Sequence, residues 1–96
     1  MQIISSGLFS DDSEIIQTID SLSYEQLLEY SVFYPQDLRH YLSIQRKWLQ
    51  DELYYLGLKL NHNPTPKEFD LDLIETKNTE RFRAFYCLKY PDKVQK

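Results

Sequence analysis

The chain has 96 residues, a formal net charge of −4 and only two glycines, and hydrophobic residues make up 42% of it. This length supports one domain with a single core, and this apolar content excludes a disordered chain. The scarcity of glycine argues against a β-sandwich or barrel, and the negative charge opposes general binding to nucleic-acid backbones. We therefore expect an all-α protein, a single small domain of four or five helices packed around one long central helix at about residues 35–60.

Charge is distributed unevenly along the sequence. Residues 1–37 carry seven acids and no Lys or Arg, whereas residues 38–96 carry all eleven bases against eight acids. The two parts could attract each other within the fold, or they could present different faces to different partners. Of these two interpretations, we expect the intramolecular attraction.

The first third of the chain predicts an arm followed by two short helices. Residues 1–10 show no regular pattern, and we expect an N-terminal arm that docks on the domain or on a partner. From about residue 12, isoleucines and a leucine recur at helical spacing, with acids in the first turn. Ser23 and Gln26 form a capping box that opens a second helix, and Pro35 then resets the chain.

Residues 35–60 predict the long helix. The centre of its apolar sector is a stripe of leucines within about 60° of one another on a helical wheel. The stripe consists of Leu38, Leu42, Leu49, Leu53, Leu56 and Leu60. An aromatic flank extends the sector to roughly half the circumference. This flank consists of Tyr41, Ile44, Trp48 and Tyr55. No single neighbour can cover so wide a sector, so either helices pack on two sides of it or the flank faces a partner. We expect the flank to be partly exposed at Trp48.

A hard turn follows the long helix and leads into a short fourth helix. Thr65 can cap this helix with its hydroxyl, and Pro66 suits the first helical position, where no backbone N–H is needed. Glu68 completes a T-x-x-E capping box by accepting the backbone N–H of Thr65. These residues predict a helix from Pro66 to about Thr76.

The last helix is predicted by aromatic residues at helical spacing. We expect Asn78 or Thr79 to cap it and Pro91 to end it. The helical domain is therefore expected to cover residues 11–91, and residues 92–96 to form a polar, frayed tail.

Residue types that support catalysis or metal binding are few. Two histidines and one cysteine cannot supply the usual four zinc ligands, and Cys87 lies among aromatic residues, where a thiol is an inert part of a core. The acids Asp70 and Asp72, with Asp51 and Glu52, are expected on solvated faces. The sequence has no glycine-rich phosphate loop and no hydrolase motif. We therefore expect no enzyme activity, no cofactor, no metal and no small-molecule substrate.

The predicted function is a small intracellular protein–protein interaction or regulatory module. Interfaces favour Trp and Tyr as anchors, so we expect the aromatic flank to be the contact surface, together with the N-terminal arm. The flank could bind another protein or form a homodimer. No leader pattern opens the sequence, and no run approaches the ~18 apolar residues that a membrane span needs, so we expect a soluble cytoplasmic protein.

The alternative function is a nucleic-acid-binding accessory protein. The last two helices are joined by a short turn and could form a helix-turn-helix-like pair. Its contacts would come from Arg39, Arg46, Lys47, Arg81 and Arg83. The competing interpretation is that the last two of these arginines lie over the edge of the core or pair with the acidic first third.

Overall fold

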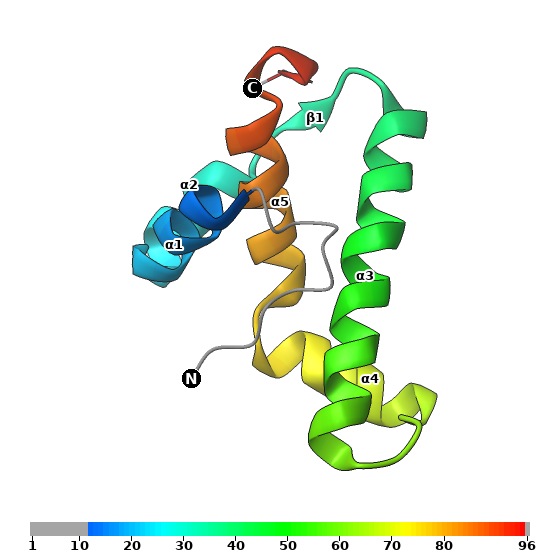
Figure 1. The fold of residues 1–96 in the computed structure, drawn as a ribbon. Helices are drawn as coiled ribbons and strands as arrows, with labels where there is room; N and C mark the ends of the chain where they lie inside the picture. Colours follow the sequence, from blue (N-terminus) through cyan, green and yellow to red (C-terminus); the bar gives the residue numbers. More distant parts are fainter. Residues whose placement is uncertain (1–11, 96) are drawn as a thin grey trace.

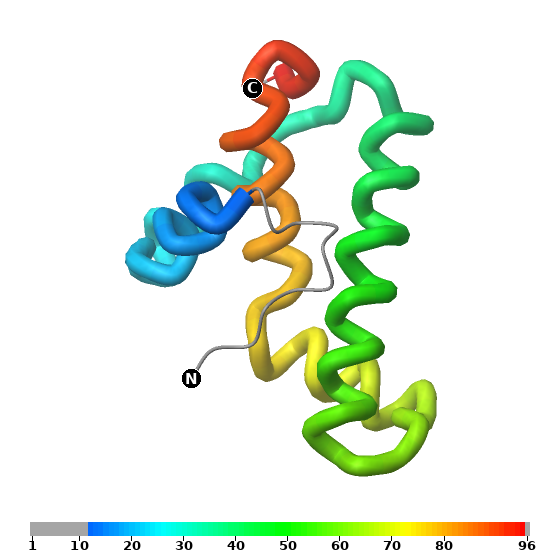
Figure 2. Tube along the Cα trace, viewed as in Figure 1, coloured from blue at the N-terminus to red at the C-terminus, as the bar shows by residue number. Residues whose placement is uncertain are grey.

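A computed structural model of the protein describes residues 12–95, so the predicted arm at residues 1–10 lies outside the described residues. The described elements, in chain order, are α1 Ser13–Ser21, α2 Tyr24–Ser31, β1 Tyr34–Pro35, α3 Leu38–Leu60, α4 Pro66–Glu75, α5 Asn78–Lys89, a 3-10 turn Pro91–Lys93 and β2 Val94–Gln95. The all-α fold with one long central helix is confirmed. Figures 1 and 2 show α5 between the α1 and α2 pair and α3, with α4 below.

Both predicted capping boxes are present, with both of their hydrogen bonds. At the start of α2 the backbone N–H of Gln26 donates to Ser23 Oγ, and the Ser23 N–H donates to the Gln26 side chain. At the start of α4 the Thr65 N–H donates to Glu68 Oε1 at 2.8 Å, and the Glu68 N–H donates to Thr65 Oγ1. Each cap satisfies N–H groups that a helix end otherwise leaves without a partner, which stabilises these short helices by about 1 kcal/mol each.

The long helix begins at Leu38, three residues later than the predicted Pro35. Asp37 caps it by accepting the N–H of His40 at 3.1 Å. Pro35 instead lies in β1, which pairs antiparallel with β2 and so takes part of the predicted tail into the fold. The 3-10 turn Pro91–Lys93 reverses the chain and allows this pairing. The residue pattern of the tail does not predict it.

The core lies where aromatic residues of α3 and α5 meet. Phe82, Phe85 and Tyr86 of α5 have almost no exposed surface. The Trp48 and Phe85 ring centroids are 4.9 Å apart, and so are those of Tyr41 and Tyr86. Such tilted and edge-on pairs are the favoured geometry for aromatic side chains, and each ring buries a large area. Ile19 of α1, Leu27 of α2 and Phe33 complete the cluster, and Cys87 is buried beside it as a free thiol.

The leucine stripe is not the buried centre of α3. Leu38, Leu42 and Leu53 are 59%, 48% and 40% exposed, whereas Trp48 is 9% exposed. The expectation that Trp48 is partly exposed is therefore wrong. The helix is rotated about its axis so that its aromatic flank contacts α5, because rings packed against rings bury more apolar area per residue than leucines would. Leu38, Leu42 and Leu53 are left on the outer side, whereas Leu49 and Leu60 are half-buried and Leu56 is buried.

Candidate interaction surface

The predicted aromatic flank divides between the core and its edge. Tyr41 and Trp48 are buried against α5, while Ile44 and Tyr55 are half-buried. Tyr41 also accepts a hydrogen bond from Arg83 through its hydroxyl oxygen, at 2.9 Å. Two of the four residues expected to meet a partner therefore pack inside this domain, and the flank does not form a continuous exposed strip.

Arg83 joins α5 to the end of α2 and to α3. Its Nε donates to the carbonyl of Ser31, one terminal nitrogen donates to the carbonyl of Phe33, and the other donates to the Tyr41 hydroxyl. The guanidinium also lies 4.1 Å from the centroid of the Phe33 ring. A planar group with donors in a fixed fork suits three acceptors and an aromatic face at once. The hydrogen bonds of the Arg83 guanidinium are therefore made within this domain.

The acidic first third and the basic remainder are attracted to each other, as expected. Arg81 of α5 forms an ion pair with Asp20 of α1. Lys89 at the other end of α5 lies 2.8 Å from the carboxylate of Asp12, whose side chain is buried just before α1. These two pairs hold α1 along α5.

The other three basic residues lie exposed on the outer side of α3: Arg39, Arg46 and Lys47. Of the five basic residues that could contact a nucleic acid, the three on α3 are therefore exposed, and the two on α5 bind groups of this domain. The helix that would read a DNA groove, α5, buries six of its 12 residues. A recognition helix needs an exposed face with free side chains, which this packing does not offer.

A groove runs along the outer side of α3. We call Leu38, Leu42, Leu49 and Leu53 the leucine face. Leu42, Leu49 and Leu53 line an open groove of about 400 Å³ together with Phe69 of α4. Gln45, Arg46 and Gln50 form its polar border. The groove therefore has an apolar floor and a polar border.

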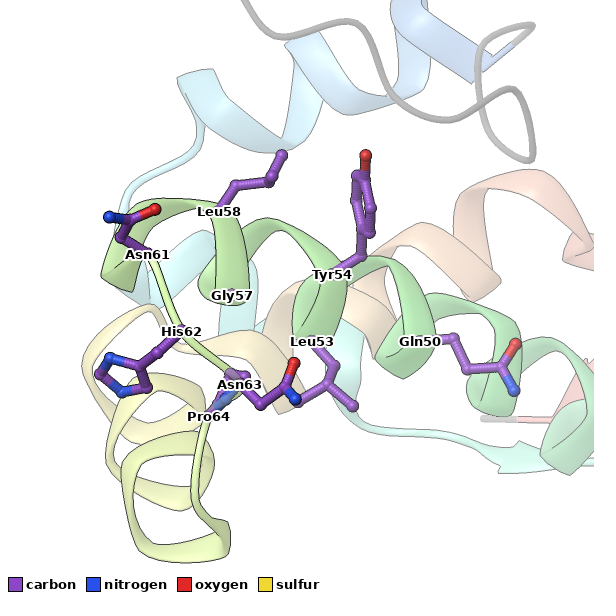
Figure 3. A pocket seen from close by; sticks show the side chains of 9 residues that line it. All are labelled: Gln50, Leu53, Tyr54, Gly57, Leu58, Asn61, His62, Asn63 and Pro64. Carbon is purple, nitrogen blue, oxygen red and sulfur yellow. The ribbon is translucent and has the colours of Figure 1, made fainter.

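A second hollow continues the groove toward the end of α3. Gln50 and Leu53 line both, and the second is closed by the loop 61–64. Figure 3 shows Leu53 and this loop on one side of α3 and Tyr54 with Leu58 on the other. Gly57 forms part of the lining, and a Cβ there would lie 3.5 Å from Pro64 Cδ, an ordinary contact. The absence of a side chain at Gly57 keeps this hollow open.

A pair of carboxyl groups fixes α4 on α3. Asp72 of α4 is buried, and its Oδ2 has no hydrogen-bond partner among the described residues. Burial first, and then the hydrogen bond to Asp72 and its negative charge, raise the pKa of Glu52 on α3 from 4.5 to about 7. A proton held on Glu52 supplies a donor that two ionised carboxylates would lack. The expectation that Glu52 and Asp72 lie on solvated faces is therefore wrong.

Sequence reasoning missed this pair because it compared acids only within one helix. Asp70 and Asp72 do point in different directions, but Asp72 meets Glu52, which lies 20 positions earlier in the chain. One signal was available. Asp72 follows Phe69 by three residues and precedes Leu73, so it falls on the apolar side of its helix. An acid at such a position must find a partner or a proton.

Searches against known protein families, curated proteins and solved structures give no match for this chain, so its function is inferred from its own geometry. Within residues 12–95, no helix combines the length and the apolar character that a bilayer crossing requires. The same residues contain no group of three or more His, Cys, Asp or Glu side chains placed to hold one metal ion.

Proposed function

We propose that this protein is a small, non-enzymatic protein–protein interaction or regulatory module whose contact surface is the leucine face of α3. The observation that supports it most is the exposure of Leu38, Leu42 and Leu53 at 59%, 48% and 40% on one side of one helix. Contiguous exposed apolar side chains beside a groove are typical of protein contact sites, whereas single exposed leucines are ordinary. The surface thus differs from the predicted aromatic flank, but it lies on the same helix.

The groove supports the same proposal through its shape. Phe69 stands beside Leu49 and Leu53, so an apolar ridge on a partner could be covered on two sides. Helix-in-groove recognition works in this way, with apolar anchors about one helical turn apart. The polar border of Gln45, Arg46 and Gln50 would then satisfy the polar groups at the edge of the contact.

The alternative, a nucleic-acid-binding accessory protein, retains only the exposed residues Arg39, Arg46 and Lys47 as candidates. Arg81 and Arg83 make their contacts inside the domain. Phosphate contacts dominate such affinity, and three bases on a chain of net charge −4 make a weak site.

In-cell photo-cross-linking tests the proposal. A photo-reactive amino acid replaces Leu42 in one variant and Leu28 of α2 in the other. Leu28 is a matched control, since it is 37% exposed and lines neither the groove nor the second hollow. We expect protein adducts from position 42 and few from position 28. Nuclease-sensitive adducts would instead support the nucleic-acid alternative, and equal or absent adducts at position 42 would contradict the interaction function.

A further inference from the structure

The leucine face has a positively charged border on one edge and a neutral border on the other. On a helical wheel of α3, Arg39 and Arg46 lie about 20° from each other along one edge of the leucines, and Gln45 lies on the other edge. Both arginines are exposed. Among the described residues that line the groove, Arg46 is the one charged residue, and Arg39 lies about one turn before the groove begins. The charge beside the leucine face is therefore positive and confined to one edge.

The two arginines of this edge are not neutralised within the domain. Residues 38–50 carry three bases and no acid. The ion pairs formed within residues 12–95 use bases of α5 and His62, and none of them includes Arg39 or Arg46. The guanidinium groups of this edge thus remain free to bind carboxylates of a partner, which is the pairing that arginine favours.

The acids of α3 and α4 do not reverse the charge of the groove. Glu52 lies on the neutral edge of the leucine face, where it forms a hydrogen bond with Asp72 of α4. No Asp or Glu is among the described residues that line the groove or the second hollow. A carboxylate of a partner beside the arginines would therefore meet no like charge on the walls of the groove.

The dimensions of the groove indicate the kind of segment that fits. From Leu42 to Leu53 the groove extends about 16 Å along α3, which is three helical turns. Arg39 and Arg46 are seven positions apart, or about 10 Å and two turns along one edge. An amphipathic helix with apolar side chains three and four positions apart would fill such a groove. Two acids about two turns apart on one edge of that helix would lie opposite the arginines.

We propose that the groove binds an acidic amphipathic helix of another protein, with its apolar side chains on the leucine face and its carboxylates beside Arg39 and Arg46. This inference rests on the proposed function, because it names the chemistry of the partner for the same surface. The apolar anchors supply most of the affinity, and the carboxylates select the partner and its direction along α3. A nucleic acid could pair with the arginines, but its phosphates would leave the leucines uncovered.

Fluorescence anisotropy of two labelled peptides with the full chain tests the chemistry of the partner. The acidic peptide has about 16 residues, with leucines three and four positions apart and two glutamates on one edge, and the basic peptide has lysines in place of these glutamates. We expect the full chain to bind the acidic peptide about tenfold more tightly than the basic one, and the preference to shrink as salt is added. Equal binding of the two peptides, tighter binding of the basic one, or no binding of either overturns the proposal.

Charge reversal in the protein tests the edge. Arg46→Glu leaves one base and one acid along it, so the preference for the acidic peptide should disappear, and the further change Arg39→Glu should invert it. Lys47→Glu is the matched control, since Lys47 is exposed on the same helix but lies about 150° from the centre of the leucine face. This control should keep the preference of the wild type. Equal effects of Arg46→Glu and Lys47→Glu would contradict a specific contact along this edge.

The acidic partner and the interaction function can fail separately. If position 42 forms protein adducts in cells but the two peptides bind equally, the interaction function stands and the acidic partner is wrong. If there are no adducts and neither peptide binds, both are wrong. A single-stranded oligonucleotide serves as a third probe, and binding tighter than that of the acidic peptide would contradict the proposal in favour of a nucleic acid.

Discussion

The two apolar parts of α3 have opposite environments, although they belong to one helix. On the aromatic flank, Trp48 and Tyr41 contact the rings of α5 at centroid distances near 5 Å. On the leucine face, Leu38 and Leu42 remain exposed. Rings bury the most area per residue and interlock with other rings, so the aromatic residues of α5 determine which part of α3 turns inward. The comparison shows that the apolar side chains left outside, rather than the largest ones, mark the candidate contact surface.

The largest difference in the free energy of unfolding is expected when one residue on each part of α3 is truncated. Trp48→Ala should lower the free energy of unfolding by about 3–5 kcal/mol, because it leaves a cavity between α3 and α5. Leu42→Ala should cost less than about 1 kcal/mol in the monomer, since Leu42 is already 48% exposed. Denaturant unfolding of dilute samples measures both. Equal losses at the two positions would show that the leucine face is also core.

Arg83 is a charged residue that stabilises the buried aromatic contacts of α3, through its hydrogen bond to Tyr41. Arg83→Lys should lower the free energy of unfolding by about 2–3 kcal/mol, since an ammonium cannot reach three acceptors in a planar fork and one or more would lose its donor. The same change at the exposed Arg39 should have almost no effect. Thermal unfolding of the two variants measures the difference. A nucleic-acid role for Arg83 would predict lost binding without lost stability.

The carboxyl pair between α3 and α4 should make stability depend on pH in a defined direction. Burial and the contact with Asp72 raise the pKa of Glu52 to about 7, above its usual value of 4.5. The folded protein therefore holds this proton more tightly than the unfolded chain does. The stability that the proton supplies is fully present below pH 4.5 and is lost as the pH rises through about 7.

Glu52→Gln removes this loss, because the amide cannot ionise and can still donate to Asp72. At about pH 8 the variant should be more stable than the wild type by roughly 1–2 kcal/mol, a value reduced for the half-burial of Glu52, and near pH 4 the two should be equal. Denaturant unfolding across this range measures the difference, with Asp70→Asn on the exposed side of α4 as control. A constant difference at all pH values would contradict a shared proton.

The smallest expected effect is at Gly57, in the hollow beside the leucine face. Gly57→Ala should raise the free energy of unfolding by about 0.5–1 kcal/mol, because alanine favours the helix and its Cβ would make only ordinary contacts with Pro64. Thermal unfolding of the variant and of the wild type measures the gain. A loss of stability would contradict the ordinary contact expected between the added methyl group and Pro64.

The caps of the short helices could be predicted from the sequence, whereas the rotation of α3 about its own axis could not. The capping boxes at Ser23 and Thr65 act within three residues, so their hydrogen bonds follow from residue type and spacing. The direction in which α3 faces depends on α5, about 40 residues later in the chain. Roughly half of the circumference of α3 is apolar, so its own pattern allows several rotations.

The candidate site was missed for the same reason. The preference of interfaces for tryptophan suggests Trp48 as an anchor, but the rings of Phe82 and Phe85 provide it with partners inside the chain. The pairing of Glu52 with Asp72 requires the turn at residues 61–65 to bring α4 back along α3. Neither contact can be read from the spacing of residues within one helix.

The rotation of α3 can be measured directly by NMR of the dilute monomer, with labelled leucine methyl groups and a soluble paramagnetic probe. The probe broadens the signals of groups that solvent reaches. We expect strong broadening for Leu38, Leu42 and Leu53, and protection of Leu56 and of the Trp48 indole, which are 6% and 9% exposed. Protected signals for Leu38 and Leu42 with a broadened Trp48 indole would contradict the account, because the aromatic flank would then be the exposed side of the helix.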